Sequence, residues 1–411
     1  MKVLLVNKFN FVKGGADKYF LDLADLLSSH KIEVAKFCMH HPNNLPDKYS
    51  RYFAENINFD HFEFKNIFKY LAHIFWNRQA AKQFEKLLED FKPDIIHVHS
   101  IFHHLSPSIL PVAKRRGIPV VMHLHDYKLV CPNYKMFAGG KIDESAKGGR
   151  YWRCVAKRCV KDSYSKSLVA SLEMWLHHKV LKVYEKNIDL YIAPSKFMKN
   201  KMIDWDLPAE KIIVLYHFVD TKKFKANFEL GDYLLYFGRL DKEKGVDKLI
   251  KAMTKVRGDK KLKIVGFGPE HATLKVLAKK LSLGERVEFL GPKYAEDLKN
   301  IIAKAYLVVI PSQWYEVFGL VNIEAAAMGK FVVASNIGGI SEAVLGSHTA
   351  LLFNPSNVSE LATKLNWSLD NPKVIAEGGR EARDFVAERF SPEKHFKGLM
   401  KIYESFVSSK P

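Results

Sequence analysis

The sequence of 411 residues has no long hydrophobic run and little cysteine. No stretch approaches the ~18 consecutive apolar residues expected of a membrane-spanning helix, and the opening segment MKVLLVNKFN is too short for a signal peptide. We therefore expect a cytoplasmic protein. Four cysteines in a chain of this length do not form a disulfide framework.

The sequence also lacks the common phosphate-binding fingerprints. The dinucleotide motif needs three glycines in the order G-x-G-x-x-G. VKGGADKY (12–19) has only the pair Gly14–Gly15, and VGFGPEH (265–271) has His271 at the third glycine position. No Walker A sequence is present, and the D-x-D pair Asp204–Asp206 does not directly follow a predicted strand. These absences disfavour a hydride-transfer enzyme, a P-loop ATPase and many metal-assisted sugar transfers.

Positive charge is in excess, with 64 lysines and arginines against 45 acidic residues and a formal net charge of +19. Residues 128–201 contain sixteen of these cations and only six acidic residues. Such a concentration favours a polyanionic partner: phospholipid, nucleic acid or a phosphorylated substrate. A lysine-rich surface that is merely solvated is the alternative. No helix-turn-helix or RNA-stacking pattern accompanies the charge, so nucleic acid is not expected.

Short apolar runs alternate with segments of helical periodicity along the whole chain. KVLLVN (2–7) begins one series, and YLLYFGRL (233–240) begins a second. Strands that alternate with helices predict doubly wound parallel sheets, and a single core seldom exceeds roughly 250–300 residues. We therefore predict an α/β protein with two Rossmann-like domains, residues 1–210 and 211–388.

Loops rich in glycine, histidine, arginine or glutamate follow nearly every predicted strand. Ligands bind at the carboxyl ends of the strands in open parallel sheets. Two such domains facing each other would place all these loops around one central cleft. In VKGGADKY, Gly14 and Gly15 would allow a ligand to approach the backbone at the start of a helix, although an ordinary turn explains the pair equally well.

GRLDKEKG (238–245) follows the predicted strand that opens the second series. Arg239 can fork onto phosphate oxygens, and Lys244 supplies a second positive charge. Together they could neutralise a diphosphate without a metal ion. The alternative is a solvated run of charges.

EVFGLVNIE (316–324) places two glutamates eight residues apart, with Gly319 between them. A helix is predicted from about Leu320, so Glu316 lies in a loop and Glu324 in the first helical turns. Free N–H groups at that helix start suit a phosphate, and the carboxylates suit sugar hydroxyls. A capping acid and a solvated acid are the alternative.

His125 directly follows the predicted strand PVVMHL (119–124), where it could hold or polarise a substrate. The histidines near it fit no standard zinc spacing, and alternation along strands would point several of them to different faces. We therefore expect no metal at these positions, which are His97, His99, His103, His104 and His123.

The cysteines Cys131, Cys154 and Cys159 lie in the basic segment that follows. With a histidine such as His177 they could form a structural Cys₃His zinc site that pins a loop. Free thiols are the alternative interpretation.

Two segments, 61–91 and 171–186, combine aromatic and basic residues with helical periodicity. This pattern is typical of an amphipathic helix lying at a membrane interface. A helix that faces the core of the first domain is the usual alternative.

Over nearly its whole length, the chain resembles the retaining glycosyltransferases of glycosyltransferase family 4, which have the GT-B fold. The most specific stretches are FGRLDKEKG, IVGFGPE, VEFLGP, PSQWYEVFGLVNIEAAAMGKFVVASNIGGISEAV and LLFNP. Glu316 and Glu324 match the family's E-x7-E signature. The connector LYHFVDTKKF departs from the family's pattern, with His217 in the region where an asparagine is usual.

The resemblance implies a role for each motif. Glu316 would contact the donor sugar and Glu324 the ribose, while His125 would lie beside the sugar. Arg239 and Lys244 would clamp the diphosphate, and residues 389–411 would form a terminal helix that crosses back to the first domain. The remaining donor-binding residues implied by the resemblance are Gly14, Gly15, Gly238, Gly266, Gly268, Gly319, Leu320 and Val321.

The function implied is transfer of a sugar from a UDP- or GDP-sugar to a glycan or lipid-linked acceptor, as in polysaccharide or O-antigen biosynthesis. No cofactor would be required beyond the structural zinc considered above. The acceptor and the basic charge lead us to expect peripheral contact with the anionic inner face of the cell membrane. The alternatives are a sugar-nucleotide epimerase or phosphorylase of the same fold, or a non-catalytic nucleotide-sugar-binding protein.

Overall fold

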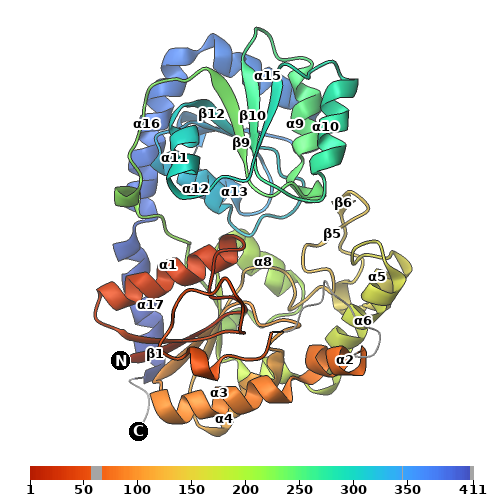
Figure 1. Cartoon of the computed structure of the whole chain (residues 1–411), viewed down its shortest axis with the longest axis vertical. Coiled ribbons are helices and arrows are strands. Elements are labelled where there is room, and N and C mark those ends of the chain that lie inside the picture. Colours follow the sequence, from red (N-terminus) through yellow and green to blue (C-terminus); the bar gives the residue numbers. More distant parts are fainter. Residues whose placement is uncertain (57–66, 345, 408–411) are drawn as a thin grey trace.

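The computed structural model describes residues 1–56, 67–344 and 346–407. Over these residues the chain forms two six-stranded parallel sheets, each in its own helix-covered domain (Figure 1). The first sheet has the order β2 (Glu33–Phe37), β1 (Lys2–Val6), β3 (Ile95–Val98), β4 (Val120–His123), β7 (Leu190–Ala193) and β8 (Ile212–Val214). The second has the order β11 (Val287–Gly291), β10 (Lys261–Val265), β9 (Tyr233–Phe237), β12 (Ala305–Ile310), β13 (Val332–Ser335) and β14 (Ala350–Phe353). The predicted fold class, two doubly wound α/β domains, is confirmed.

The sheets are built from short apolar runs that are buried on both faces, as parallel sheets require. The four residues Val3 to Val6 of β1 are all fully buried. One face of the first sheet is covered by α1 (Gly15–Ser29) and α17 (Pro392–Val407), since Phe20 and Leu23 share a core with Leu399 and Tyr403. The opposite face is covered by α3 (Arg78–Phe91) and α4 (Leu110–Arg115).

The remaining helices complete the two domains. The first domain also contains α2 (Ile67–Trp76), α5 (Trp152–Ala156), α6 (Tyr164–Met174), the π-helix η5 (Trp175–Val180), α7 (Val183–Asn187) and α8 (Lys196–Asp204), with a small hairpin of β5 (Phe137–Ala138) and β6 (Lys141–Ile142). The second contains α9 (Val246–Met253), α10 (His271–Lys280), α11 (Ala295–Ala303), α12 (Leu320–Ala327), α13 (Ile340–Ala343), α14 (Gly346–Thr349), α15 (Val358–Asp370) and α16 (Pro372–Arg389).

Each sheet reverses its direction of growth beside the first strand of its domain. The reversal lies between β1 and β3 in the first sheet and between β9 and β12 in the second. Open α/β sheets bind ligands outside the carboxyl ends of the strands at such a point. The loops after these four strands are therefore the place to look for a site.

The boundary between the domains lies later than predicted. β8 (Ile212–Val214) pairs with β7 and completes the first sheet, so the boundary after residue 210 cuts off its last strand. A run of three residues gives too short a signal to be recognised as a strand in the sequence. Beyond the second sheet, α17 returns to pack beside α1.

The segment 61–91 can be compared with the structure only in part, because residues 61–66 lie outside the described ones. α3 buries a single apolar face, as the alternative interpretation of a core-facing helix proposed. That face consists of Ala80, Phe84, Leu87, Leu88 and Phe91. No helix in the described part of the chain is long and apolar enough to cross a membrane.

Candidate active site

The two domains meet where the loop after β1 faces the start of α12. A Cβ atom built on Gly15 would lie 3.4 Å from Cδ1 of Leu320, so Gly15 sits in contact with the second domain. One turn further along α1, Lys18 Nζ lies 3.4 Å from Glu324 Oε1. These contacts place the predicted residues Gly15, Leu320 and Glu324 at one junction, and Gly14 precedes Gly15 with nothing within 4 Å of its own Cβ position. Lys18 was not predicted, although it follows the glycine pair at helical spacing.

Glu316 lies in the loop after β12 and is buried. Its Oε1 atom accepts hydrogen bonds from Lys244 Nζ at 2.6 Å and from Ser312 Oγ at 2.7 Å. Burial raises the pKa of this carboxyl, but Lys244 and the hydrogen bonds outweigh burial and hold the pKa below its ordinary value. Glu316 is therefore an ionised acceptor at neutral pH. The prediction that Glu316 and Lys244 share a site agrees with this geometry.

Glu324 has a different environment, although it belongs to the same motif. Burial raises its pKa above the ordinary value, and the nearby Lys18 only partly opposes this. Glu324 lies inside α12, whereas Glu316 precedes it, as predicted. The two carboxyl groups can therefore serve different parts of a ligand.

The N-terminus of α12 is shaped by Gly319, which adopts a left-handed φ of 88° at the cap position. A side chain there would meet the Asn322 amide at 2.4 Å, so glycine is required. The first N–H groups of a helix have no intrahelical partner, and Leu320 and Val321 occupy those positions. This end of α12 can accept an anion.

Arg239 follows β9 and projects into solvent, with 62% of its side chain exposed. Its guanidinium group contacts Asp241 Oδ2 at 2.8 Å. Arg239 and Lys244 thus each hold an acidic partner in this structure.

Cations from the first domain add to this charge. Lys8, which directly follows β1, lies near Arg239 and Lys13. Burial lowers the pKa of Lys8, and these two cations lower it further, while Asp17 and Asp126 act in the opposite direction. Sequence reasoning missed Lys8, although its place directly after the first strand could have indicated it. Positive groups from both domains therefore surround the predicted site.

The glycines after β9 and β10 let two loops touch backbone to backbone. Gly266 has a φ of 142°, and a Cβ atom there would lie 1.8 Å from the carbonyl oxygen of Gly238. A Cβ atom on Gly268 would lie 2.5 Å from the carbonyl oxygen of Leu240. This packing alone requires glycine at 266 and 268. That Gly266 and Gly268 also line the base side of the donor, and that Gly238 binds the donor, remain predictions from the family resemblance.

His125 lies at the carboxyl end of β4 within a stack of histidine rings. His125 Nε2 is 2.9 Å from His99 Nδ1, and His123 Nε2 is 3.1 Å from His217 Nε2. Burial lowers the pKa of His125 to about 3, so the ring is neutral. A neutral imidazole can donate one hydrogen bond and accept another, as a sugar hydroxyl requires.

The expectation that strand alternation would separate these histidines is wrong. His97 and His99, like His123 and His125, are two residues apart and face the same way from neighbouring strands. His123, His125 and His217 each bring one ring nitrogen to within 4.8 Å of the others, a spacing that could hold a metal ion. Sequence spacing could not show this, because His217 comes from a distant segment.

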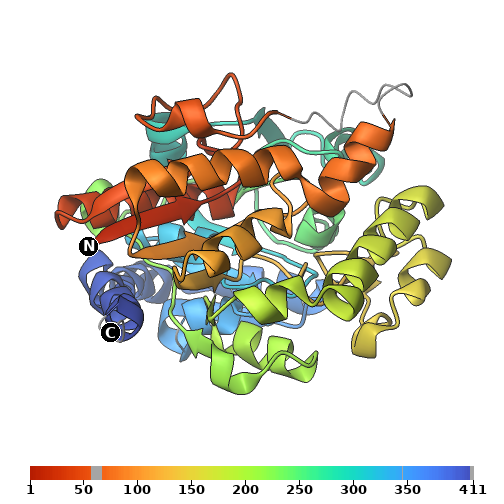
Figure 2. The same ribbon diagram turned by 90° about the horizontal axis from the view of Figure 1, so that it is seen from below.

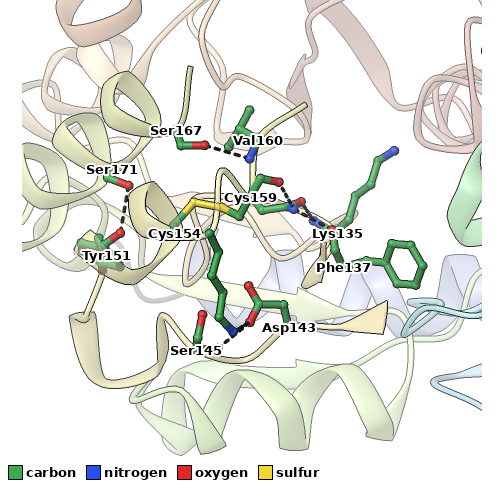
Figure 3. The surroundings of a disulfide bond; sticks show 12 residues. Lys135, Phe137, Asp143, Ser145, Tyr151, Cys154, Cys159, Val160, Ser167 and Ser171 are labelled. Atoms are coloured by element: carbon green, nitrogen blue, oxygen red, sulfur yellow. Dashed lines mark hydrogen bonds and ion pairs between the residues drawn. A yellow bond between two sulfur atoms is a disulfide. The ribbon is translucent and has the colours of Figure 1, made fainter. Parts of the chain in front are cut away.

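The predicted zinc ligands do not come together in this structure. Cys154 and Cys159 are joined in a disulfide, and Cys131 is a separate buried thiol (Figure 3). His177 Nε2 instead lies 2.7 Å from the carbonyl oxygen of Phe75. Two sulfur atoms bonded to each other cannot act as thiolate ligands. The zinc site therefore remains a prediction for the reduced chain only.

Comparison with known proteins shows the family to which the chain belongs. The family Glycosyltransferase Family 4 matches residues 13–223, and Glycosyl transferases group 1 matches residues 219–385. An uncharacterized 42.6 kDa protein in the cps region of Klebsiella pneumoniae is 28% identical over 361 residues, which cover 83% of this chain and 87% of the relative. Glycogen synthase of Mycobacterium tuberculosis is 37% identical over 322 residues, which cover 76% of this chain and 69% of the relative.

The crystal structure of Anabaena HepE in complex with UDP and glucose has the same architecture. It aligns with a TM-score of 0.69 at 20% identity and covers 98% of this chain and 100% of that chain. Two Rossmann-like domains with a candidate site between their strand ends form the GT-B fold. The chain belongs to glycosyltransferase family 4, as its sequence motifs implied.

Proposed function

We propose that the protein is a retaining glycosyltransferase that moves a sugar from a nucleoside-diphosphate sugar to an acceptor hydroxyl. The observation that carries this proposal is the ion pair of buried Glu316 with partly exposed Lys244, 2.6 Å apart, in the loop that leads to the N-terminus of α12. A carboxylate that can accept hydrogen bonds from sugar hydroxyls is thereby held in contact with an ammonium group that can donate hydrogen bonds to phosphate oxygens. The UDP and glucose of the HepE complex support a UDP-sugar as donor, with a GDP-sugar as the other candidate.

The donor's diphosphate would be bound by positive groups and backbone N–H groups rather than by a metal. Lys244 would exchange its contact with Glu316 for a phosphate oxygen, and Arg239 would do the same with Asp241. The amides of Leu320 and Val321 would meet the phosphates at the start of α12. Glu324 would then bind the ribose.

The reaction would break the bond between the anomeric carbon and the diphosphate oxygen. Arg239 and Lys244 would stabilise the negative charge that develops on the leaving diphosphate. The acceptor oxygen would attack the oxocarbenium-like carbon on the same face, and its proton would pass to the departing phosphate. His125 and Glu316 would hold the sugar hydroxyls during this step, so no enzyme nucleophile is required.

The acceptor proposed is a growing glycan or a lipid-linked sugar at the inner face of the membrane. The name of the M. tuberculosis relative, glycogen synthase, supports a glycan acceptor. The excess of cations in residues 128–201 supports contact with an anionic bilayer. A role in assembling a surface polysaccharide follows from both.

The test is release of nucleoside diphosphate from a panel of UDP-, GDP- and ADP-sugars. We expect slow hydrolysis of one donor, which Glu316→Ala abolishes. Glu296→Ala, which removes a carboxyl with an exposed side chain (75%) on α11, is the matched control and should hydrolyse that donor as the wild type does.

Three outcomes would contradict the proposal. If no donor is hydrolysed and no nucleotide raises the melting temperature, the site does not bind nucleotide sugars. If the protein converts the donor into a different nucleotide sugar, with no acceptor present and no release of nucleoside diphosphate, the enzyme is an epimerase. Binding without turnover in the presence of glycan acceptors would identify a non-catalytic binding protein.

A further inference from the structure

The helix α6 has its large apolar side chains on the solvent side. Tyr164, Leu168 and Leu172 are 60%, 47% and 47% exposed, and Trp175, at the start of η5, is 53% exposed. Steps of four, four and three residues place all four on one helical face. The buried residues of α6 include three small ones, Ser167, Ala170 and Ser171, together with Glu173 and Met174. This is the reverse of an ordinary surface helix, which buries its large apolar residues.

Hydrogen bonds on the inner side fix α6 in this orientation. Ser167 Oγ accepts from the backbone N–H of Val160 at 3.0 Å, and Ser171 Oγ donates to the carbonyl of Tyr151 at 3.0 Å. Figure 3 shows Ser167 pointing at Val160 and Ser171 pointing at Tyr151. These two partners lie on either side of the Cys154–Cys159 disulfide in the sequence. Rotating α6 to hide its apolar face would break both bonds.

A buried ion pair also holds α6 on its inner side. Lys128 Nζ lies 2.8 Å from Glu173 Oε2, and each side chain is only 2% exposed. Turning Glu173 toward solvent would leave Lys128 buried without this partner, which is strongly unfavourable. The exposed apolar face is therefore a stable feature of the fold.

The neighbouring elements α5 and η5 carry further exposed apolar side chains. Trp152 is 64% exposed, and Val180 is 49% exposed. Figures 1 and 2 both show α5 and α6 at the margin of the first domain. We call the five side chains Trp152, Tyr164, Leu168, Leu172 and Trp175 the α5–α6 surface.

Cations surround this surface. Residues 150–182 contain eight lysines and arginines and two acidic residues, one of which is the buried Glu173. Arg153 lies 5.4 Å from the ring of Trp152, and Arg158 lies 5.2 Å from the ring of Tyr164. The other exposed cations nearby are Arg150, Lys157, Lys161, Lys166, Lys179 and Lys182.

We propose that the α5–α6 surface docks the protein on an anionic lipid bilayer. Tryptophan, tyrosine and leucine side chains would enter the interface, while the surrounding lysines and arginines contact lipid phosphates. A second copy of the chain is a poor partner, because a symmetric contact would oppose two equally basic surfaces. The proposal deepens the proposed function, since it names the surface that brings the enzyme to a membrane-bound acceptor.

Vesicle co-sedimentation of the whole chain tests the proposal. We expect binding to phosphatidylcholine vesicles that contain about 30% phosphatidylglycerol, little binding to phosphatidylcholine alone, and loss of binding at high salt. The double variant Leu168→Ser and Leu172→Ser should weaken partitioning about tenfold or more, since it removes two apolar side chains from the interface.

Two further variants distinguish the contribution of the apolar α5–α6 side chains to vesicle binding from that of apolar residues elsewhere and from that of charge. Val276→Ser with Tyr294→Ser removes two apolar side chains that are 66% and 73% exposed in the second domain, and it should bind vesicles as the wild type does. Lys161→Glu with Lys166→Glu keeps the apolar face and should reduce binding to the anionic vesicles.

Equal binding by the wild type and the Leu168–Leu172 variant would overturn the proposal. So would equal binding of the wild type to neutral and anionic vesicles. Association of the wild type in solution that the same variant abolishes, without vesicle binding, would assign the surface to a second copy instead.

Measuring donor hydrolysis on the same samples separates this proposal from the proposed function. The Leu168–Leu172 variant should hydrolyse the donor as the wild type does, because neither residue contacts the site. If the wild type binds vesicles but hydrolyses no donor, the docking proposal stands and the proposed function is wrong.

Discussion

The contact between Glu316 and Lys244 illustrates how one ion pair can serve both folding and ligand binding. Their side chains are 10% and 25% exposed, so each charge depends on the other in the ligand-free protein. A diphosphate that takes Lys244 away releases Glu316 to accept from sugar hydroxyls. Binding of the two halves of the donor would thereby be coupled.

Lys244→Met should destabilise the protein by about 2–3 kcal/mol, because it leaves a buried carboxylate without its cation. Adding Glu316→Gln should restore most of this stability but not donor hydrolysis. Urea unfolding of the two single variants and the double variant measures the coupling. The exposed pair Lys299–Glu296 is the control, where Lys299→Met should cost less than about 0.5 kcal/mol. Additive effects at Lys244 and Glu316 would contradict a coupled pair.

Removing divalent metal ions should leave donor hydrolysis unchanged, because in the proposed mechanism Arg239 and Lys244 supply the positive charge at the diphosphate. The measurement is hydrolysis after dialysis against a chelator, with and without added Mg²⁺, Mn²⁺ or Zn²⁺. Activity that is lost on dialysis and returns with one of these ions would contradict a metal-free mechanism. The three histidines His123, His125 and His217 would then be the first ligands to test.

At the scale of single elements, the loops after β9 and β10 depend on a backbone contact that sequence patterns do not reveal. IVGFGPE was predicted to line the nucleotide because of the family resemblance, and the structure adds a packing reason for its glycines. The β9 loop also carries Arg239. A disturbance of the β10 loop should therefore reach the diphosphate site through this contact.

Gly266→Ala should destabilise the protein by about 3 kcal/mol or more and weaken nucleotide binding. The new methyl group would collide with the Gly238 carbonyl, and the φ of 142° is unfavourable for alanine. Gly284→Ala is the control, since nothing lies within 4 Å of its Cβ position. Thermal unfolding with and without UDP measures both effects. A Gly266→Ala protein as stable as the Gly284→Ala protein would show that the two loops move apart easily.

The helices show where pattern-based prediction succeeds and where it stops. The start of α12 and the positions of Glu316 and Glu324 could be predicted, because a glycine followed by an alanine-rich run gives a strong local signal. The orientation of α6 could not, because buried serines decide it through hydrogen bonds to a different segment. A periodicity argument assumes that the large apolar side of a helix faces the core, and here it faces solvent.

At the scale of the whole molecule, topology could be read from the alternation of strands and helices, whereas contacts between the domains could not. Two ion pairs between the domains, Lys18–Glu324 and Lys135–Glu243, connect residues that no local sequence pattern relates. The histidine stack needs the register of β3 and β4 together with the connector that carries His217. These features depend on how distant segments pack.

The protein should lose stability as the pH falls below about 6.5, because burial keeps its histidines neutral in the folded state. Burial lowers the pKa of His395 to about 4 and that of His125 to about 3. Between about pH 6.5 and these values, the unfolded chain binds protons that the folded chain does not. Each such histidine then contributes a loss of up to about 1.4 kcal/mol per pH unit. Burial also lowers the pKa of the other four histidines in the His125 stack, which are His97, His99, His123 and His217.

Urea unfolding at about pH 7, 6 and 5 measures this loss, and His395→Gln should reduce its slope by close to one proton. Buried carboxyls with raised pKa values, Asp17, Asp126 and Glu324, act in the opposite direction and make the net slope smaller. A free energy of unfolding that stays constant over this range would mean that the histidines reach solvent in the folded protein.

The return of α17 to the first domain has a consequence for chimaeras. Tyr403 and Leu399 share a core with Val3 and Leu5, and His395 Nε2 lies 2.9 Å from the hydroxyl oxygen of Tyr19. A donor-binding half exchanged between relatives by a single cut after β8 would carry a foreign α17 onto the first domain. Two cuts, one after β8 and one between α16 and α17, would keep that core intact. Donor preference would then be transplanted without disturbing the first domain, which we propose receives the acceptor.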